Sequence, residues 1–448
     1  MTMTPAELRQ RTVYRRAVEA AIWGIPAVNY DMMHQAFLRD AKGGPNQIVY
    51  WSRLLDWKNQ TLTPNPDAIY LMAFYDTTEG PVVLDVPAAG DGSITGSIDD
   101  AWQCAIEDVG PAGIDAGAGG RFLILPPDHQ GVVPDGCLPM PSATYVGYAL
   151  LRSNLRGGAD DDVEAAVTYG KTVQLYPFAQ AADIPSTTFV DAADVLFDAV
   201  IPYDVTFFEA LDRRVQSEPW LTRDKAMIDI CASIGIVKGE PFAPDPAVTE
   251  TLTAAMAEVR AWLADRYEQA FATPFYNDSR WALPASPALI EASTTNYGNP
   301  EAYPVDDRAM SYSMAFFSAK RLGTGQFYLM SISDDGGAPL DGASTYRLTV
   351  PAHVPVSMYW SATAYNRATH TLIRDVPWAS RSSHTPELST DADGSVELVF
   401  GPIAPDGKTG NWIPTRSGEQ FEVLFRFYGP TPPLFDKTWQ LPDIHPVN

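Results

Sequence analysis

The spacing of apolar residues changes twice along this chain, and that change limits the folds it can adopt. Short apolar runs between glycine and proline turns occupy about residues 48–155, which predicts β-strands. Residues 160–272 carry apolar side chains at helical spacing and predict helices. Beyond about residue 300 the period returns to two, as in half-buried strands. We therefore expect a multidomain α+β protein that is mainly β.

The same pattern divides the chain into three regions. We expect an N-terminal helix plus β domain at residues 1–158, a helical middle region at 159–300 and a C-terminal domain at 301–448. Both β domains are predicted to be antiparallel sandwiches of jelly-roll type. In residues 420–428 apolar side chains share one face of a strand, while Glu422, Arg426 and Tyr428 lie on the other.

Helix ends are marked by capping residues. Thr4 and Glu7 form a capping-box pattern before the first helix, and Pro26 is predicted to end that helix by removing a donor. Asp245 followed by Pro246 begins another helix, and apolar residues then keep helical spacing for about five turns.

Charge and composition restrict the partners. The formal net charge is −24, which repels phosphate backbones and anionic headgroups, so we expect neither nucleic acid nor membrane as a partner. Three scattered cysteines provide no disulfide framework. The sequence shows no signal peptide and no apolar run of about 18 residues, so a cytoplasmic protein is expected.

Motifs for nucleotide, zinc and α/β-hydrolase chemistry are missing from the sequence. The six histidines show no metal-ligand spacing, and we expect neither a metal nor a cofactor. His353 and His384 lie in polar or proline-flanked loops and are the histidines most open to an exposed or functional role, although a structural role is the more common one.

Several unusual strings occur in a fixed order along the chain. They include AVEAAIWGIP at 17–26, LTPNPDAIY at 62–70, GPVVLDVP at 80–87, NWIP at 411–414 and RFYGP at 426–430. Together they resemble the two-part family of domains of unknown function 1254 (N-terminal) and 1214 (C-terminal). The resemblance implies two sandwich-like domains with helices between them and a homo-oligomer. It implies no activity.

The segment around Asn65 is the main candidate site in the N-terminal half. Prolines on both sides hold Asn65 extended, so Asp67 could act as a general base and Tyr70 as a hydrogen-bond donor. The structural alternative is an Asx turn that starts a strand. Asp31 would add a second carboxylate if folding brought it to Asp67, and Trp23 would line the same site.

The C-terminal half offers aromatic, amide and cationic candidates. Trp360 and Trp412 could form the walls of a binding site, Asn411 could orient a ligand and Tyr365 could donate a hydrogen bond. A tryptophan that seals the sandwich edge is an equal alternative for Trp412. Arg381 could bind an anion or could pair with one of the many surface carboxylates.

These candidates support two main hypotheses. The first is an acid–base hydrolase or lyase without a metal, which acts on a small, largely apolar organic molecule in a cleft between domains. The second is a non-catalytic protein that binds a hydrophobic or carbohydrate ligand, and a structural subunit is a third. A catalytic carboxylate in a pocket with a perturbed pKa would favour the enzyme.

Overall fold

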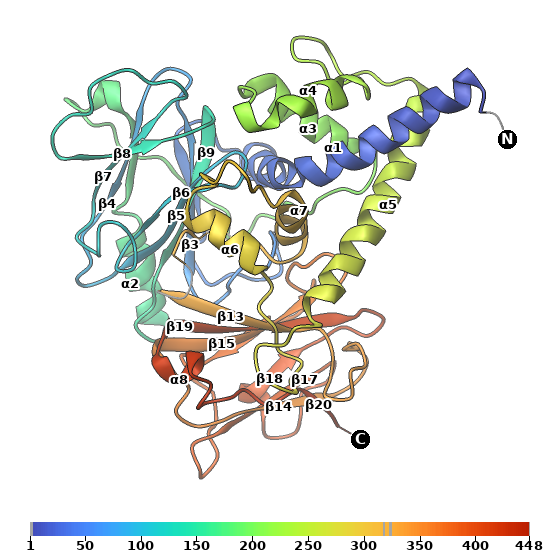
Figure 1. Cartoon of the computed structure of the whole chain (residues 1–448). Helices are drawn as coiled ribbons and strands as arrows, with labels where there is room; N and C mark the ends of the chain where they lie inside the picture. The colour runs from blue at the N-terminus through green and yellow to red at the C-terminus, as the bar shows by residue number, and fades with distance from the viewer. Residues whose placement is uncertain (1–2, 317–318, 322–324, 448) are drawn as a thin grey trace.

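A computed structural model describes residues 3–316, 319–321 and 325–447. It is a mixed α+β structure with several sheets, as the sequence predicts. Figure 1 shows a β sandwich in each half of the chain, with long helices packed beside and between them. Within the described residues, no helix is both long and apolar enough to cross a membrane.

Two sheets form the N-terminal sandwich. The larger one has the order β11-β1-β3-β9-β5-β6 and the smaller one β10-β4-β7-β8, and the apolar side chains between them form one core. The bounds are β1 Gln47–Tyr50, β3 Ile69–Asp76, β4 Val82–Val86, β5 Ile94–Asp100, β6 Ala105–Val109, β7 Gly120–Leu125, β8 Cys137–Pro141, β9 Val146–Ser153, β10 Gln174–Pro177 and β11 Phe189–Asp191. A small pair joins β2 (Asn59–Gln60) to β12 (Phe197–Asp198).

Helices cover the other face of the larger sheet. Helix α1 packs against α3, α4, α5 and α7, and its buried side shares a core with β3 and β9. The bounds are α1 Pro5–Gln35, η1 Ala36–Asp40, α2 Asp160–Gly170, η2 Phe178–Gln180, α3 Val205–Ser217, η3 Thr222–Asp224, α4 Lys225–Ala232, α5 Pro246–Ala270, α6 Pro287–Thr294 and α7 Val305–Met314. The predicted cap of α5 is confirmed, because the Asp245 side chain accepts a bond from Val248 N.

The C-terminal sandwich packs two four-stranded sheets around a core of its own. Their orders are β13-β19-β15-β16 and β18-β17-β14-β20. The bounds are β13 Gln326–Ser331, β14 Tyr346–Val350, β15 Val356–Asn366, β16 Ser380–Ser382, β17 Val396–Gly401, η4 Thr409–Asn411, β18 Trp412–Pro414, β19 Phe421–Pro430, α8 Pro432–Phe435 and β20 His445–Pro446.

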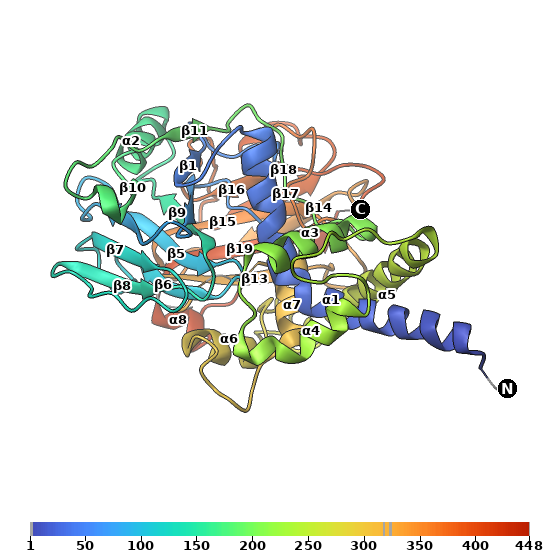
Figure 2. The ribbon, with the colours of Figure 1, turned by 90° about the horizontal axis from the view of Figure 1, so that it is seen from above.

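Two sequence predictions about elements are wrong. Helix α1 continues past Pro26 to Gln35, and Figure 2 shows that it bends along its length. The helix continues because residues beyond the proline, Tyr30 among them, are buried in the core with α3. Residues 174–198 lie within the predicted helical stretch but form β10, β11 and β12. Their backbone pairs with β4, β1 and β2, and the N-terminal sheets therefore extend past residue 158.

Candidate functional site

The site is built on one face of the sheet β13-β19-β15-β16. Alternate residues of β15 and β19 point into the C-terminal core, whereas the polar residues between them face the N-terminal half. Those polar residues are buried: Ser361 and Glu422 are 0% exposed and Arg426 is 2% exposed. The alternation that usually marks a solvent-facing strand therefore marks an interface between the two halves here.

The segment that enters β3 lies on this polar face. Arg426 donates from Nη2 to the carbonyl oxygen of Thr63 at 2.8 Å and also contacts the Tyr365 hydroxyl. That hydroxyl donates to the carbonyl oxygen of Pro64 at 2.6 Å. Thr63 has a φ of 36°, a left-handed conformation that β-branched residues rarely adopt. Tyr365 and Arg426 thus hold a strained backbone against the C-terminal sheet.

Asn65 connects the same segment to two tyrosines. Its Nδ2 group donates to the hydroxyls of Tyr359 and Tyr428 at 2.9 and 2.8 Å. Its Oδ1 atom accepts a bond from the Asp67 backbone N–H at 3.0 Å, which is the predicted Asx turn. The backbone N–H of Asn65 donates to the Tyr70 hydroxyl at 3.0 Å. Together these bonds fix the place and direction of Asp67.

Asp67 faces a cavity of about 490 Å³ between the two halves, here called the Asp67 cavity. Asp67 is 7% exposed, and burial raises the pKa of its carboxyl above the ordinary range. The hydroxyls of Ser380 and Ser382 and the charge of Arg426 oppose that rise. The residues that line the cavity are Leu54, Leu55, Pro66, Asp67, Leu155, Gly158, Ala159, Asp160, Trp378, Ala379, Ser380, Arg381, Ser382, His384, Thr385, Pro386 and Glu387.

A cation and an imidazole line the cavity with Asp67. The Arg381 guanidinium lies 4.1 Å from the centre of the Trp378 ring, and its Nη2 donates to Thr409 O at 3.2 Å. Among the described residues, no carboxylate forms an ion pair with Arg381. The His384 ring stacks on Tyr359 with centroids 4.8 Å apart. Burial lowers the pKa of both Arg381 and His384, so the imidazole is neutral at neutral pH.

Several buried polar atoms at this cavity have no hydrogen-bond partner among the described protein groups. They are Asp67 Oδ2, Arg381 Nε and His384 Nδ1. Buried polar atoms in folded proteins are nearly always bonded, so a group of unpaired ones needs a cause. A polar ligand or bound water in the cavity would supply the missing partners.

Asp31 and Trp23 lie elsewhere, on α1. The Asp31 carboxylate pairs with Arg213 at 2.6 Å and with Arg214 at 3.0 Å, both on α3. The Trp23 indole donates to Asp224 Oδ1 at 3.1 Å. Asp31 therefore pairs with the buried Arg214 and the partly exposed Arg213, and it does not form a pair of carboxylates with Asp67.

Three of the C-terminal candidates, Trp360, Asn411 and Trp412, also lie outside the lining of the Asp67 cavity. Trp360 packs in the C-terminal core. Asn411 binds the backbone of Ser389 through both ends of its carboxamide, at 2.8 Å each, and so fixes a loop. Trp412 donates to a backbone carbonyl and packs edge-on against Trp378, the ring that lines the cavity, with centroids 5.5 Å apart. Trp412 thus supports the cavity wall from behind.

Of the predicted site residues, the structure places Asp67 and Arg381 in one cavity and puts Asn65, Tyr70 and Tyr365 in the framework behind Asp67. The sequence reasoning did not select Ser361, Ser380, Ser382 or Trp378. The signal for the serines was their alternation with other residues on β15 and β16, which places Ser361 opposite Ser382. Within the described residues, no group of three His, Cys, Asp or Glu side chains could hold a metal ion.

Two family models match the chain, one in its N-terminal half and one in its C-terminal half. Residues 45–177 match the family model "Protein of unknown function (DUF1254)", and residues 325–432 match "Protein of unknown function (DUF1214)". The chain carries both regions of this two-part family. The DUF1254 match covers the strands β1 to β10 and the segment of Asp67, and the DUF1214 match covers the polar-faced sheet. The Asp67 cavity therefore lies where the two regions meet.

Solved structures resemble the chain over nearly its whole length. The VPA0106 protein from Vibrio parahaemolyticus is 18% identical and has a TM-score of 0.59, over 96% of this chain and 100% of that one. An uncharacterized protein from Burkholderia cenocepacia is 12% identical, with a TM-score of 0.40, over 98% of this chain and 94% of that one. No curated protein matches the sequence. The likeness to the Vibrio protein concerns the fold alone.

Proposed function

We propose that this DUF1254–DUF1214 protein is an acid–base enzyme, a hydrolase or lyase, that acts on a small organic molecule in the Asp67 cavity. The observation that carries the proposal is the buried Asp67 carboxyl with its raised pKa, which faces the same cavity as Arg381 and His384. The volume of about 490 Å³ is in the range of small-molecule sites.

The side chains divide the chemistry between them. Asp67, once deprotonated, accepts a proton from water in a hydrolysis or from a carbon next to a carbonyl in an elimination. Its raised pKa makes the carboxylate a stronger base than an exposed aspartate. Arg381 binds a carboxylate or carbonyl oxygen of the substrate. His384, neutral because burial lowers its pKa, donates or accepts a hydrogen bond.

The substrate has an apolar part as well as a polar one. Leucine, proline, alanine and tryptophan side chains make up about half of the cavity lining, and Trp378 offers a flat face. The formal net charge of −24 makes nucleic acid a poor partner, so we propose a small molecule as the ligand.

The test compares turnover in matched variants. Candidate substrates are p-nitrophenyl esters from acetate to octanoate for hydrolysis and 3-hydroxy acids for elimination. Asp67→Asn should lower kcat by about 10²–10⁴-fold, and Arg381→Gln should chiefly raise KM. Asp393→Asn, at an exposed turn, is the charge-matched control and should change neither. Turnover that Asp67→Asn leaves unchanged would contradict the proposal.

A binding protein is the second candidate. The observation that favours it is the Trp378 ring in the cavity wall, with Trp412 packed edge-on behind it. Such a wall can hold an apolar or carbohydrate ring without any reaction. Binding of these ligands that needs Trp378 but no carboxylate at position 67, together with an absence of turnover, would support this function over the enzyme.

A further inference from the structure

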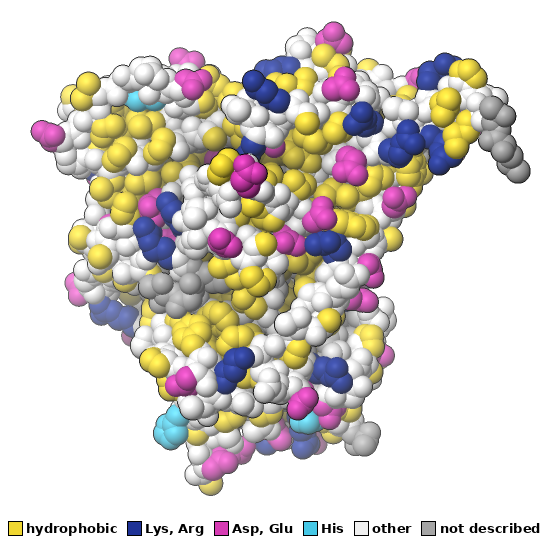
Figure 3. All heavy atoms as spheres, in the orientation of Figure 1, with side chains coloured by type: hydrophobic (Ala, Val, Ile, Leu, Met, Phe, Trp, Pro, Cys, Tyr) yellow, Lys and Arg dark blue, Asp and Glu magenta, His cyan; other side chains and the backbone are white. Residues whose placement is uncertain are grey.

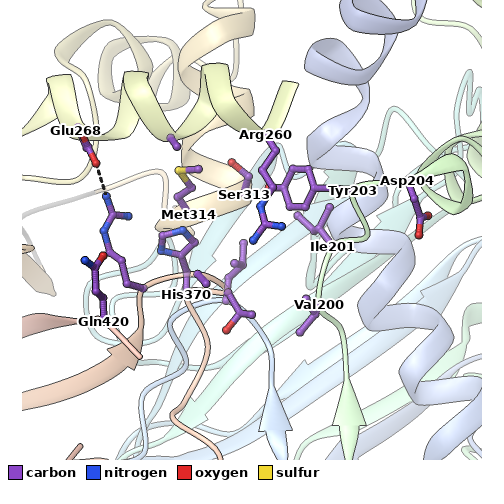
Figure 4. Close-up of a pocket in the computed structure, with 15 residues that line it drawn as sticks. Val200, Ile201, Tyr203, Asp204, Arg260, Glu268, Ser313, Met314, His370 and Gln420 are labelled. Atoms are coloured by element: carbon purple, nitrogen blue, oxygen red, sulfur yellow. Dashed lines mark ion pairs between the residues drawn. The ribbon is translucent and has the colours of Figure 1, made fainter. Parts of the chain in front are cut away.

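A second cavity, of about 580 Å³, borders the segment that carries Asp67. Here it is called the His370 cavity, and Figure 4 draws its lining side chains. Leu62 lines this cavity and Asp67 lines the other, so one short segment contributes to both. The lining residues are Leu62, Val200, Ile201, Tyr203, Asp204, Arg260, Ala264, Glu268, Ser313, Met314, Arg367, Ala368, Thr369, His370 and Gln420.

His370 is held in one orientation by a buried glutamate. Its Nδ1 atom lies 2.7 Å from Glu422 Oε1, and Glu422 is 0% exposed. The other carboxylate oxygen accepts a bond from the Tyr267 hydroxyl at 3.0 Å. A carboxylate at Nδ1 holds a proton on that nitrogen, so Nε2 is the ring nitrogen left for a ligand. No described protein group bonds to Nε2.

The backbone of His370 is also fixed. Its φ of 56° is left-handed, and its N–H and C=O groups bond to Asn366 and Thr63 at 2.7 and 2.8 Å. A histidine is held in this conformation only where its surroundings determine it. The ring therefore faces the cavity as part of a rigid turn.

One exposed arginine that lines the cavity, Arg260, has no carboxylate partner among the described residues. The Arg260 guanidinium lies 5.3 Å from the centre of the Tyr203 ring, and within the described part of the chain no ion pair includes it. Figure 4 shows Arg260 reaching down from α5 beside Tyr203. The other arginine, Arg367, pairs with Glu268 at 3.7 Å and lies 3.6 Å from Glu422, so its charge is balanced.

Asp204, the other acidic residue that lines the cavity, does not neutralise the charge of Arg260. Asp204 caps α3 by accepting bonds from the backbone and hydroxyl of Thr206 at 2.9 and 2.6 Å. Figure 4 shows its carboxylate directed away from Arg260. Apolar side chains, Ile201 and Met314 among them, also line the cavity. Figure 4 shows Met314 beside His370 and Ile201 beside Tyr203.

We propose that the His370 cavity binds a small organic monocarboxylate. Its carboxylate pairs with Arg260, its short apolar chain lies against Met314, and its other end faces His370. A single unpaired cation fits one carboxylate better than a phosphate, which recruits several cationic or N–H donors. This site is independent of the function proposed for the Asp67 cavity.

The test titrates straight-chain carboxylates from acetate to hexanoate into the full-length protein by calorimetry, with butyramide as the uncharged comparison. Carboxylates should bind and butyramide should bind at least tenfold more weakly. Arg260→Gln should weaken carboxylate binding by about 10–100-fold. Arg9→Gln, an exposed arginine near the start of α1, is the charge-matched control and should leave it unchanged.

A second measurement locates the ligand. In protein labelled with ¹³C at histidine Cε1, the resonance missing from His370→Gln identifies His370 among six histidines. That resonance should move when butyrate is added to the wild type and stay fixed in Arg260→Gln. The proposal is overturned if no carboxylate binds, if butyramide binds equally, if Arg260→Gln binds normally, or if Arg381→Gln abolishes binding, since the ligand would then occupy the Asp67 cavity.

Discussion

At the scale of single residues, Asp67 combines burial with incomplete hydrogen bonding. Burial raises its pKa, so the folded protein binds the proton of Asp67 more tightly than the unfolded chain does. The stability that this proton confers is complete below the ordinary aspartate pKa of about 3.9. It is lost as the pH rises through the higher pKa of the folded state.

We therefore expect Asp67→Asn to be more stable than the wild type near pH 8, with a difference that disappears near pH 3. The reason is that asparagine carries no charge to bury. Urea denaturation at a series of pH values measures the difference. Asp393→Asn should instead be less stable than the wild type near pH 8, because a hydrogen bond from Ser395 lowers the pKa of the exposed Asp393 carboxyl. A pH-independent difference for Asp67→Asn would contradict the raised pKa.

Gly158 brings the two halves into close contact at the rim of the Asp67 cavity. A Cβ atom there would lie 1.7 Å from the carbonyl oxygen of His384, which is backbone and cannot rotate away. We expect Gly158→Ala to lower the free energy of unfolding by about 1–3 kcal/mol and to weaken any ligand of the cavity. Gly90→Ala, where a Cβ would meet nothing within 4 Å, is the control, measured by the same urea titration.

At the scale of elements, helix α1 is held to α3 by Asp31. Its carboxylate is 0% exposed and pairs with Arg214, whose side chain is 8% exposed. Removing one partner of a buried pair leaves the other charge without compensation. We expect Asp31→Ala to lower the free energy of unfolding by about 3–5 kcal/mol. Glu19→Ala, on the exposed side of α1, should change it by less than about 0.5 kcal/mol. Equal effects of the two changes would show that the pair contributes nothing.

The same helix shows what the sequence could and could not predict. Local patterns predicted the caps at Thr4 and Asp245 and the strands at 82–86 and 420–428, because neighbouring residues determine them. The path of α1 through Pro26 depends on burial against α3, and β10 to β12 depend on pairing with distant strands. No local pattern contains that information.

The candidate site was predictable only in part for a related reason. Asp67 is recognisable in the sequence because it follows a proline-flanked asparagine, and Arg381 because it lies between serines. The fold brings the two residues to one cavity. Glu422 and His370 are distant in the sequence, and their pairing at 2.7 Å appears only in the folded chain. The alternating polar residues of β19 are compatible both with a face exposed to solvent and with a buried interface. Only the cover supplied by the segment around Asn65 decides between them.

At the scale of the whole molecule, the two halves share one core. Met330, Leu372 and Leu424 from the C-terminal half lie in the same apolar cluster as α1 and α5. Arg426 and Asn65 add hydrogen bonds in both directions across the boundary. A large shared core of this kind opposes independent motion of the halves. The geometry of both cavities therefore depends on the packing of the two halves against each other.

We expect the full chain to unfold in a single calorimetric transition, with a calorimetric enthalpy close to the van't Hoff enthalpy. Asn65→Ala removes two bonds to the C-terminal sheet, and should lower the free energy of unfolding by about 1–3 kcal/mol while the transition stays single. Asn46→Ala, which removes an amide that bonds within the N-terminal half at Asp76, should also leave one transition. Two resolved transitions in the wild type, or a shift of only one of them in Asn65→Ala, would show that the halves fold separately. The cavities would then open and close with the boundary between the halves, because Asn65 and its tyrosine partners lie directly behind Asp67.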